Sequence, residues 1–385
     1  MHNRTEQFLN DPVFPLLIRM SAPNTIAFFI QAIVVLAEVW FISKLGTTSL
    51  AAVALAFPVI MLTQQMAFGA LGGAVTSSIA RSLGAEDKER AEKLLWHSLL
   101  LSCCGYLLFF LIFFIGGESL LMALGGEGSL LEESLLYIKI FLTGAIFIWL
   151  SGTLSAALRG IGNMRFPALL MIAGSGIQVI LAGGLILGWF GFPKLGIIGA
   201  PLSAISVAAL MAIVMIFKFM HSSSNVQLKL SNLSFKKELF RDIFNVALPA
   251  SLAPIFTVGT ILILTGLVGQ FGVSALAGYG IGSRIEFLMI PLVFGIGTAM
   301  TTMVGTNIGA KKVERAERIG WLGGSFAGLF SGMIGLMLIL SSSYWINFFA
   351  TDQATYEVTK QYIEIVGLCF TFQGLGLSLY FASQG

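Results

Sequence analysis

The sequence predicts an all-α membrane protein that crosses the bilayer many times and is built from two parallel six-helix repeats. Composition, ten apolar runs and an internal duplication together predict this fold class. Hydrophobic residues make up 56% of the chain and charged residues only 11%, whereas soluble domains carry about 25% charged residues. The net charge of +3 is too small to indicate nucleic acid as a partner.

Ten apolar runs are long enough to cross a bilayer, which takes about 20 helical residues. Several exceed the length of a perpendicular crossing, so tilted helices are expected. Cys103, Cys104 and Cys369 lie within such runs, without metal-ligand spacing, and are expected to fill the core. The ten runs lie at 14–42, 50–80, 94–116, 131–158, 165–189, 197–220, 245–269, 275–306, 320–348 and 357–384.

The basic residues orient these spans. Loops on one side hold only Lys44 and Lys194, and the opposite set is strongly basic. By the positive-inside rule, the N-terminus and the loops after spans two, four, six and eight are cytoplasmic. We therefore expect a multi-pass protein of the inner (cytoplasmic) membrane. The basic set is Arg4, Arg81, Lys88, Arg90, Lys93, Arg159, Arg165, Lys218, Lys229, Lys236, Lys237, Arg241, Lys311, Lys312, Arg315 and Arg318.

The chain matches itself at a nearly constant offset. A register held from Pro23 to Gly160 with a single one-residue slip indicates a duplicated unit. Because each unit has an even number of spans, the two units are parallel, with a central cavity between them. At an offset of 226 the matches include Pro23 with Pro249, Gly46 with Gly272 and Thr76 with Thr302; at 225 they include Arg90 with Arg315, Tyr137 with Tyr362 and Gly160 with Gly385.

The duplication predicts the domain organisation. We expect an N-terminal six-helix lobe at 1–220, a polar cytoplasmic linker at 221–238 and a C-terminal lobe at 239–385. The first unit continues beyond Gly160 through two more spans, but its partner Gly385 is the last residue. We therefore expect this chain to be a fragment of a twelve-helix protein, and we expect it to be a monomer.

The first span carries an unusual polar stripe. Asn24, Gln31 and Glu38 are spaced by seven residues, about two helical turns, and so lie on one side of an apolar helix. A carboxylate in an apolar span costs roughly 2.5 kcal/mol or more on insertion scales, which makes it a candidate functional group. The alternative is a Glu38 that reaches the interface beside Lys44, but the aligned amides favour a polar-lined cavity.

Several segments resemble one transporter family. IRMSAPNTI, GGAVTSSIARSLGAEDKERAEK, RGIGNMRFP and VGTNIGAKKVERAE look like parts of a bacterial multidrug and toxic compound extrusion (MATE) transporter. The resemblance covers essentially the whole chain. It implies a twelve-helix exporter with a V-shaped central cavity, which exchanges cationic, amphipathic drugs for protons or sodium ions by rocking its two lobes.

The resemblance also implies roles for single residues. Glu38 occupies the place of the acidic residue on helix 1 of the family, and Gln31 matches the pattern there. Pro23 stands where some members have a helix-bending proline, and loss of its hydrogen bond predicts a bend. Glu286 matches an acidic position of the second lobe, so Glu38 and Glu286 are expected to bind substrate. Asn24 of the polar stripe and the aromatic residue Tyr279 are predicted to bind substrate as well.

Helix 5 departs from the family pattern. Where the family often has two Asn residues and an Asp, this chain has Ser175, Gln178 and Ala182, which still share one helical face. The resemblance implies that Ser175 and Gln178 contact substrate, but the carboxylate is absent. Hard cations prefer several oxygen ligands, so we expect protons rather than sodium as the coupling ion, with no cofactor and no metal site.

Glu38 and Glu286 are the glutamates that fall well inside the predicted spans. We hypothesise that Glu38, with Gln31, exchanges a proton for a cationic substrate. Glu286 has a second interpretation, because Arg284 lies two residues away and the two could form a structural charge cluster. Tyr279 and Trp149 are candidate cavity residues, although aromatic residues in membrane proteins mostly pack or face lipid.

Other function classes fit less well. The three histidines lie at the edges of predicted spans and no nucleotide-binding motif is present, so an enzyme or an ATP-driven pump is not expected. A channel would not need the duplication or the buried carboxylate. The remaining alternative is a lipid-linked oligosaccharide flippase of the same superfamily, which would favour a strongly cationic cavity. The predicted spans hold few arginines, mainly Arg19 and Arg284.

Overall fold

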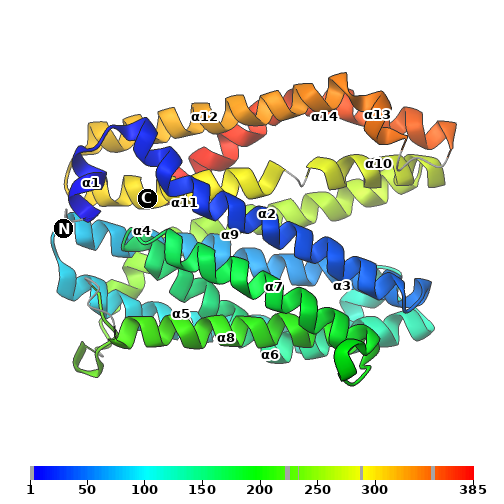
Figure 1. Cartoon of the computed structure of the whole chain (residues 1–385), viewed down its shortest axis with the longest axis horizontal. Coiled ribbons are helices and arrows are strands. Elements are labelled where there is room, and N and C mark those ends of the chain that lie inside the picture. The colour runs from blue at the N-terminus through cyan, green and yellow to red at the C-terminus, as the bar shows by residue number, and fades with distance from the viewer. Residues whose placement is uncertain (1–3, 222–225, 233, 287–288, 348–351) are drawn as a thin grey trace.

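The computed structural model is a bundle of long helices (Figure 1). It describes residues 4–221, 226–232, 234–286, 289–347 and 352–385. Within these ranges ten helical segments are long and apolar enough to cross a membrane. The ten predicted spans and the all-α fold class are therefore confirmed, and each predicted run overlaps one of the observed segments.

The first six spans form what we call the N-lobe. Its helices pack around a continuous apolar core. Its elements are α1 (Arg4–Asn10), α2 (Val13–Ser43), α3 (Thr47–Gln65), the π-helical turn η1 (Met66–Leu71), α4 (Gly72–Gly84), α5 (Lys88–Ala123), α6 (Gly128–Gly160), α7 (Arg165–Leu187), the short 3-10 turns η2 (Trp189–Gly191) and η3 (Gly196–Ile198), and α8 (Gly199–His221).

The remaining spans form what we call the C-lobe. The predicted eighth span, 275–306, overlaps α10 and α11, and the residues between them, 287–288, lie outside the described part of the chain. The predicted ninth, 320–348, ends early at Leu340. The elements are the 3-10 turn η4 (Leu230–Asn232), α9 (Lys237–Gly269), α10 (Val273–Glu286), α11 (Ile290–Gly309), α12 (Val313–Leu340), α13 (Ser342–Ile346) and α14 (Gln353–Gln384).

The two lobes repeat each other in detail. Gly46 and Gly272, 226 residues apart, both precede a helix with a positive φ (128° and 101°), a conformation that glycine adopts without strain. Further along, the Thr76 hydroxyl donates to the Ala156 carbonyl at 3.0 Å, and Thr301 donates to Phe381 at 2.8 Å. Both residues of the second pair lie 225 positions after the first. The predicted match of Thr76 with Thr302 is therefore one residue off.

The extra residue of the N-lobe lies between Gly46 and Thr76, and the π-helical turn η1 falls in that interval. A π-turn closes i→i+5 hydrogen bonds and so accommodates one more residue than an α-turn. The second span of the N-lobe can therefore keep the same faces as its C-lobe counterpart on both sides of the insertion. Periodicity analysis does not reveal such a turn, because the flanking helices remain in phase.

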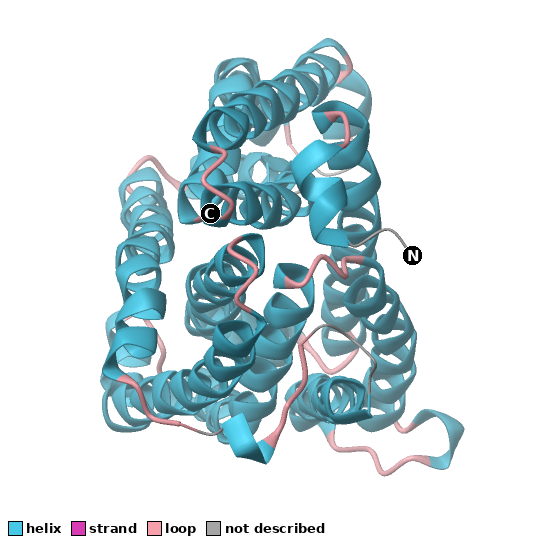
Figure 2. Cartoon of the chain, turned by 90° about the vertical axis from the view of Figure 1, so that its left-hand side faces the viewer, coloured by secondary structure: helices cyan, strands magenta, loops and turns pink. Residues whose placement is uncertain are grey.

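The lobes meet closely at the end of the bundle that carries α1, where α4 packs against α11; we call this contact the seam. A Cβ atom at Gly84 would lie 2.0 Å from the Thr306 carbonyl oxygen, and one at Gly309 would lie 2.0 Å from that of Arg81. These two glycines occupy equivalent repeat positions, so the seam is reciprocal. Figure 2, which looks onto the end with both termini, shows two groups of helices with the C-terminus at their boundary.

The first helix of each lobe crosses from one lobe to the other. Near its start α2 packs against α11 of the C-lobe, and further along it packs against α7 of its own lobe. In the same way α9 contacts α4, α5 and η1 of the N-lobe. Pro23 and Pro249 lie inside these two helices, which remain continuous. The crossing places the polar stripe of α2 against both lobes.

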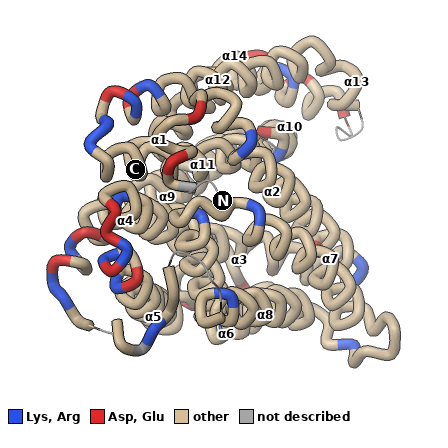
Figure 3. Tube along the Cα trace, turned by 60° about the vertical axis from the view of Figure 1, so that its left-hand side comes forward, with Lys and Arg blue, Asp and Glu red and all other residues tan. Residues whose placement is uncertain are grey.

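Charged residues gather at the end of the bundle that carries α1, α4 and α5 (Figure 3). That end contains most of the basic residues that the positive-inside rule assigns to the cytoplasm. Cys103, Cys104 and Cys369 are exposed. Their predicted role in the core was wrong: an apolar run places a residue in the membrane but does not say whether it faces protein or lipid.

Candidate functional site

Glu38 lies near the C-terminal end of α2, where it faces α7 and α8. Its Oε1 atom accepts hydrogen bonds from Gln178 Nε2 at 2.8 Å and Ser203 Oγ at 3.4 Å. The phenol of Tyr137, on α6, lies close enough for an electrostatic interaction with Glu38. The carboxylate is thus surrounded by neutral polar groups, and no described basic residue forms an ion pair with it.

The rest of the stripe follows the same helix face toward the seam. One polar pair lies between α2 and α7, where Ser175 Oγ donates to Gln31 Oε1 at 3.0 Å. Nearer the start of α2, Asn24 Nδ2 donates to Thr298 Oγ1 at 3.2 Å and contacts the Met164 sulfur at 3.5 Å. The structure therefore aligns the three stripe residues toward α7 and its N-terminal end, as their spacing predicts.

The face of α7 that meets this stripe is the one predicted from sequence. Ser175, Gln178 and Ala182 are all buried, and the first two contact Gln31 and Glu38 directly. Asn24 differs from Gln31 and Glu38, which are partly exposed, since it is only 2% exposed and lies between the lobes. A solute could reach Asn24 only after the lobes separate.

Glu286 forms a second acidic site within the C-lobe. Its carboxylate accepts hydrogen bonds from Tyr362 Oη at 2.7 Å and Gln373 Nε2 at 2.6 Å, both on α14. The Tyr279 ring meets the Tyr362 ring edge-on, with centroids 5.6 Å apart. Among the described residues, Arg284 forms no ion pair with Glu286, so neutral donors from another helix hold this carboxylate.

The two acidic sites share one feature of the repeat. Tyr137 and Tyr362 are 225 residues apart; Tyr362 donates a hydrogen bond to Glu286, and Tyr137 lies within electrostatic range of Glu38. The glutamates themselves are not equivalent, because Glu38 is on the first span of its lobe and Glu286 on the second. The two carboxylates have no common partner among the described residues, so the structure presents two separate acidic sites.

Trp149 does not belong to either site. It is 4% exposed and its ring lies against Gly105 and Phe109, inside the N-lobe between α5 and α6. The prediction of a cavity role for Trp149 was therefore wrong. The absence of a side chain at Gly105 lets the ring pack inward.

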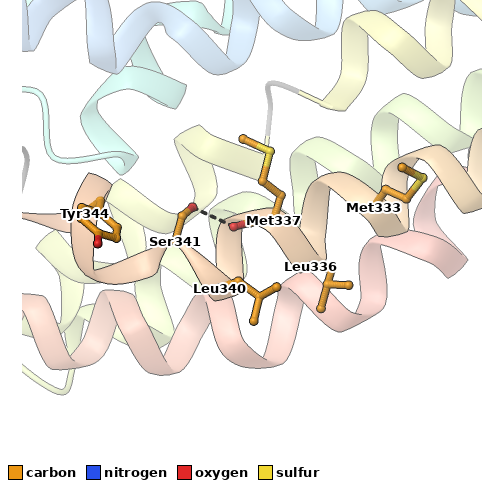
Figure 4. A pocket seen from close by; sticks show the side chains of 6 residues that line it. All are labelled: Met333, Leu336, Met337, Leu340, Ser341 and Tyr344. Carbon is orange, nitrogen blue, oxygen red and sulfur yellow. Dashed lines mark hydrogen bonds between the residues drawn. The ribbon is translucent and has the colours of Figure 1, made fainter.

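Two surface hollows lie outside these sites. One, of about 410 Å³, is bordered by Met333, Leu340 and Tyr344 on α12 and α13 (Figure 4). The equivalent face of α5, which includes Leu108 and Ile115, is also exposed and apolar, so this hollow belongs to the bilayer-facing surface. The other, of about 240 Å³, lies between α2, α11 and α12. Neither contains Glu38 or Glu286.

Four partners of the carboxylates were missed by sequence reasoning: Ser203 and Tyr137 at Glu38, and Tyr362 and Gln373 at Glu286. Each lies on a helix that is distant in sequence from its glutamate. The repeat match of Tyr137 with Tyr362 was the one available signal, because it marked a polar aromatic position retained in both lobes.

Comparison with known proteins agrees with this architecture. The MatE family model matches residues 23–183 and again 249–385, so the two matches begin at the equivalent prolines Pro23 and Pro249. The chain is 26% identical to the FAD transporter of Shewanella oneidensis, over 97% of this chain and 82% of that protein. It is 25% identical to the multidrug export protein MepA of Staphylococcus aureus, over 96% and 81%.

Solved structures of the same architecture superimpose closely. One is described as the outward-facing conformation of a multidrug resistance MATE family transporter; its TM-score is 0.87 at 25% identity, covering 98% of this chain and 84% of that one. Another, a MOP superfamily transporter from Pyrococcus furiosus described as having a reversed polarity of its binding pocket, gives 0.89 at 25% identity, over 100% and 85%. With both repeats matched, this chain belongs to the MatE family, whose members are transporters and not enzymes.

Proposed function

We propose that this protein is a secondary antiporter of the inner membrane, with a cytoplasmic N-terminus, that exports cationic amphipathic compounds in exchange for protons. Glu38 is the exchange group. The observation that carries this proposal is a membrane-embedded carboxylate held by the neutral donors Gln178 and Ser203. Such a group has no fixed counter-ion, so either a proton or an organic cation can neutralise it.

The exchange follows from this competition. When Glu38 is ionised, the negative charge attracts a cationic substrate, and apolar side chains around it can hold the amphipathic remainder. A proton arriving from the outer side neutralises the carboxylate and removes that attraction, so the cation leaves outward. After the lobes rock, a substrate from the cytoplasm displaces the proton. One site that holds only one of the two ligands is sufficient to couple their movements.

The surroundings of Glu38 favour a proton over sodium. A hard cation prefers several oxygen ligands, and both hydrogen bonds to Glu38 come from donor groups, the Gln178 amide and the Ser203 hydroxyl. Ala182 on the same face of α7 supplies no oxygen from its side chain. A proton needs only the carboxylate itself.

Glu286 supplies a second substrate contact in this proposal. Its carboxylate lies beside the rings of Tyr279 and Tyr362, and a cation is attracted both to a carboxylate and to an aromatic face. Two acidic sites in different lobes allow a flat, extended cation to bind either lobe. The monomer contains both sites, so no second subunit is required.

One observation favours a second candidate, transport of an organic anion. Arg159, at the end of α6, is 5% exposed, and its Nε atom has no hydrogen-bond partner. No described carboxylate forms an ion pair with it, and its Nη1 atom donates only to Ser155 at 3.1 Å. A buried guanidinium can bind a phosphate through two parallel hydrogen bonds, which would suit a nucleotide or a lipid-linked pyrophosphate. FAD, named in the description of the Shewanella relative as a FAD transporter, belongs to that substrate class.

The test is ethidium uptake into inside-out membrane vesicles with an acidic lumen, with and without sodium. The wild-type protein is expected to accumulate ethidium without sodium, and Glu38→Gln is expected to lose this activity. Glu364→Gln is the matched control, because Glu364 is an exposed glutamate on α14 and lies outside both acidic sites. It should transport like the wild type.

Other outcomes would contradict the role of Glu38, the coupling ion or the substrate class. Full proton-driven uptake by Glu38→Gln would remove Glu38 from the mechanism, and a strict need for sodium would replace the coupling ion. If the wild type moves no ethidium under either gradient, the organic-anion function is favoured. Loss of FAD or lipid-pyrophosphate transport on Arg159→Gln would then support it.

A further inference from the structure

At the cytoplasmic face, each lobe holds the chain segment that leads into the first helix of the other lobe. On the N-lobe side, the start of α5 contacts the approach to α9. Trp96 Nε1 donates to the Lys229 carbonyl at 2.9 Å, and the Lys236 backbone amide donates to His97 Nε2 at 3.0 Å. Glu92 accepts a hydrogen bond from the backbone amide of Gln227 at 3.2 Å.

The C-lobe makes the equivalent contact with the approach to α2. Arg315, which is the repeat partner of Arg90, donates to the carbonyl of Phe8 at 3.2 Å and also to that of Asp11. Lys312 Nζ donates to the Leu9 carbonyl at 3.2 Å. The start of α12 therefore holds the segment before α2, as the start of α5 holds the segment before α9.

The two contacts differ in charge. On the N-lobe side, the Asp242 carboxylate of α9 binds two guanidinium groups, Arg81 Nη2 at 2.8 Å and Arg90 Nη2 at 2.9 Å. On the C-lobe side, Arg315 binds neutral backbone carbonyls, and the repeat position of Asp242 is occupied by Leu16. Among the described residues, the ion pairs of Asp242 are the ones that join the two lobes.

We propose that Asp242, with Arg81 and Arg90, is the latch that holds the transporter closed toward the cytoplasm. In this proposal, opening the cytoplasmic side separates α4 and α5 from α9 and breaks both pairs. The three side chains are each at least a fifth exposed, so water solvates them once they part. An ion pair between partly exposed side chains contributes little to stability, so the latch can open reversibly. Two charge-assisted hydrogen bonds to one carboxylate fix the geometry of the closed state.

Asp242 is therefore a positioning residue for the conformational cycle and does not touch substrate. The latch depends only on the contact of α4 and α5 with α9, so it holds whichever ion or substrate is carried. It also explains an asymmetry of the repeat. A strong ionic contact on both sides would fix the closed state, whereas one ionic and one neutral contact leave the lobes able to rock.

The test is the rate at which a cytoplasmic maleimide labels a cysteine in the seam. Thr306→Cys supplies the reporter, since Thr306 is 2% exposed and its carbonyl lies against Gly84. The native cysteines are replaced by serine. Asp242→Asn is expected to raise the labelling rate about tenfold, a change of about 1.4 kcal/mol in the opening equilibrium. Arg90→Gln alone should raise it less.

Two comparisons separate a latch from general loosening. Glu89→Gln removes a carboxylate that pairs with Lys93 within α5, and it should leave the labelling rate unchanged. Adding Arg90→Gln to Asp242→Asn should produce no further increase, because both changes release the same latch. Equal labelling of Asp242→Asn and wild type would overturn the proposal, as would an equal increase in Glu89→Gln or multiplied effects in the double variant. If Asp242→Asn does not fold, Arg90→Gln decides by the same criterion.

Discussion

Among single residues, Glu38 can bind either a proton or a cation because its hydrogen-bonding neighbours carry no charge. Gln178 and Ser203 donate hydrogen bonds to the carboxylate, but neither carries a charge that would neutralise it. A basic residue in their place would form a permanent ion pair and remove the competition between proton and cation. The neutral surroundings therefore keep the site responsive to both ligands.

Replacing Gln178 with methionine tests this role. The change keeps the side-chain length but leaves the carboxylate without its 2.8 Å hydrogen bond, and a hydrogen bond to a charged group contributes roughly 1.5–3 kcal/mol. We expect transport efficiency for a cationic dye to fall about tenfold or more, measured as initial uptake rates in inside-out vesicles.

The control for that change lies one turn away. Ser175→Ala removes a hydrogen bond to Gln31 from the same face of α7 but leaves Glu38 untouched. It should lower the rate much less than Gln178→Met. Equal losses in the two variants would mean that the α7 face acts only through packing.

Part of this site could be predicted from sequence. Helical periodicity placed Gln31 and Glu38 on one stripe and Ser175 and Gln178 on one face, and the structure brings stripe and face together. Periodicity could not identify Ser203, because α8 has no fixed rotation relative to α2 until the bundle is packed. The functional roles of these residues remain predictions.

At the scale of elements, the most informative departure from regular helix is the π-turn η1. It lies between α3 and α4, contacts α9 of the other lobe, and coincides with the interval where the repeat register slips by one residue. An inserted residue normally rotates one half of a helix by about 100° relative to the other. The π-turn confines the insertion to one turn.

A single deletion should therefore be tolerated inside the π-turn and nowhere nearby. Deleting Ala70 should convert η1 to regular helix and leave the faces of α3 and α4 in place. We expect its melting temperature in detergent to fall by less than about 4 °C, which corresponds to roughly 1 kcal/mol in a large domain. Deleting Ala54 should rotate Ser49 and Ala52 away from the core and prevent folding. Similar damage from both deletions would contradict this explanation.

Helix positions were predictable from sequence, but helix ends and interruptions were not. The third predicted span began at 94, yet α5 begins at Lys88, because the Asp87 side chain accepts a hydrogen bond from the Arg90 amide and extends the helix into polar sequence. A hydropathy profile does not detect such a cap, because the capped first turn is polar.

At the scale of the whole molecule, the duplicated fold is symmetric in its seam and asymmetric in its chemistry. Gly84 and Gly309 make reciprocal backbone contacts, while Glu38 and Glu286 occupy different repeat positions. A symmetric seam permits two lobes to rock about a shared axis, and unequal acidic sites allow the two lobes to differ in what they bind. We expect both properties to be needed for export.

The orientation of the bundle gives a prediction with a simple readout. Phe190 and Phe235 are both strongly exposed, the first between α7 and α8 and the second before α9. In a background without native cysteines, an impermeant maleimide should label Phe190→Cys in intact cells and Phe235→Cys only after permeabilisation. The reverse pattern would place the N-terminus outside and invert the direction of transport.

Proton release on substrate binding reports whether Glu38 exchanges a proton for a cation. Tetraphenylphosphonium is added to the purified protein in weakly buffered detergent solution near neutral pH, and the pH change is recorded. We predict release of about one proton per cation bound by the wild type, and none by Glu38→Gln. Release that persists unchanged in Glu38→Gln, or binding by the wild type without any release, would contradict the account.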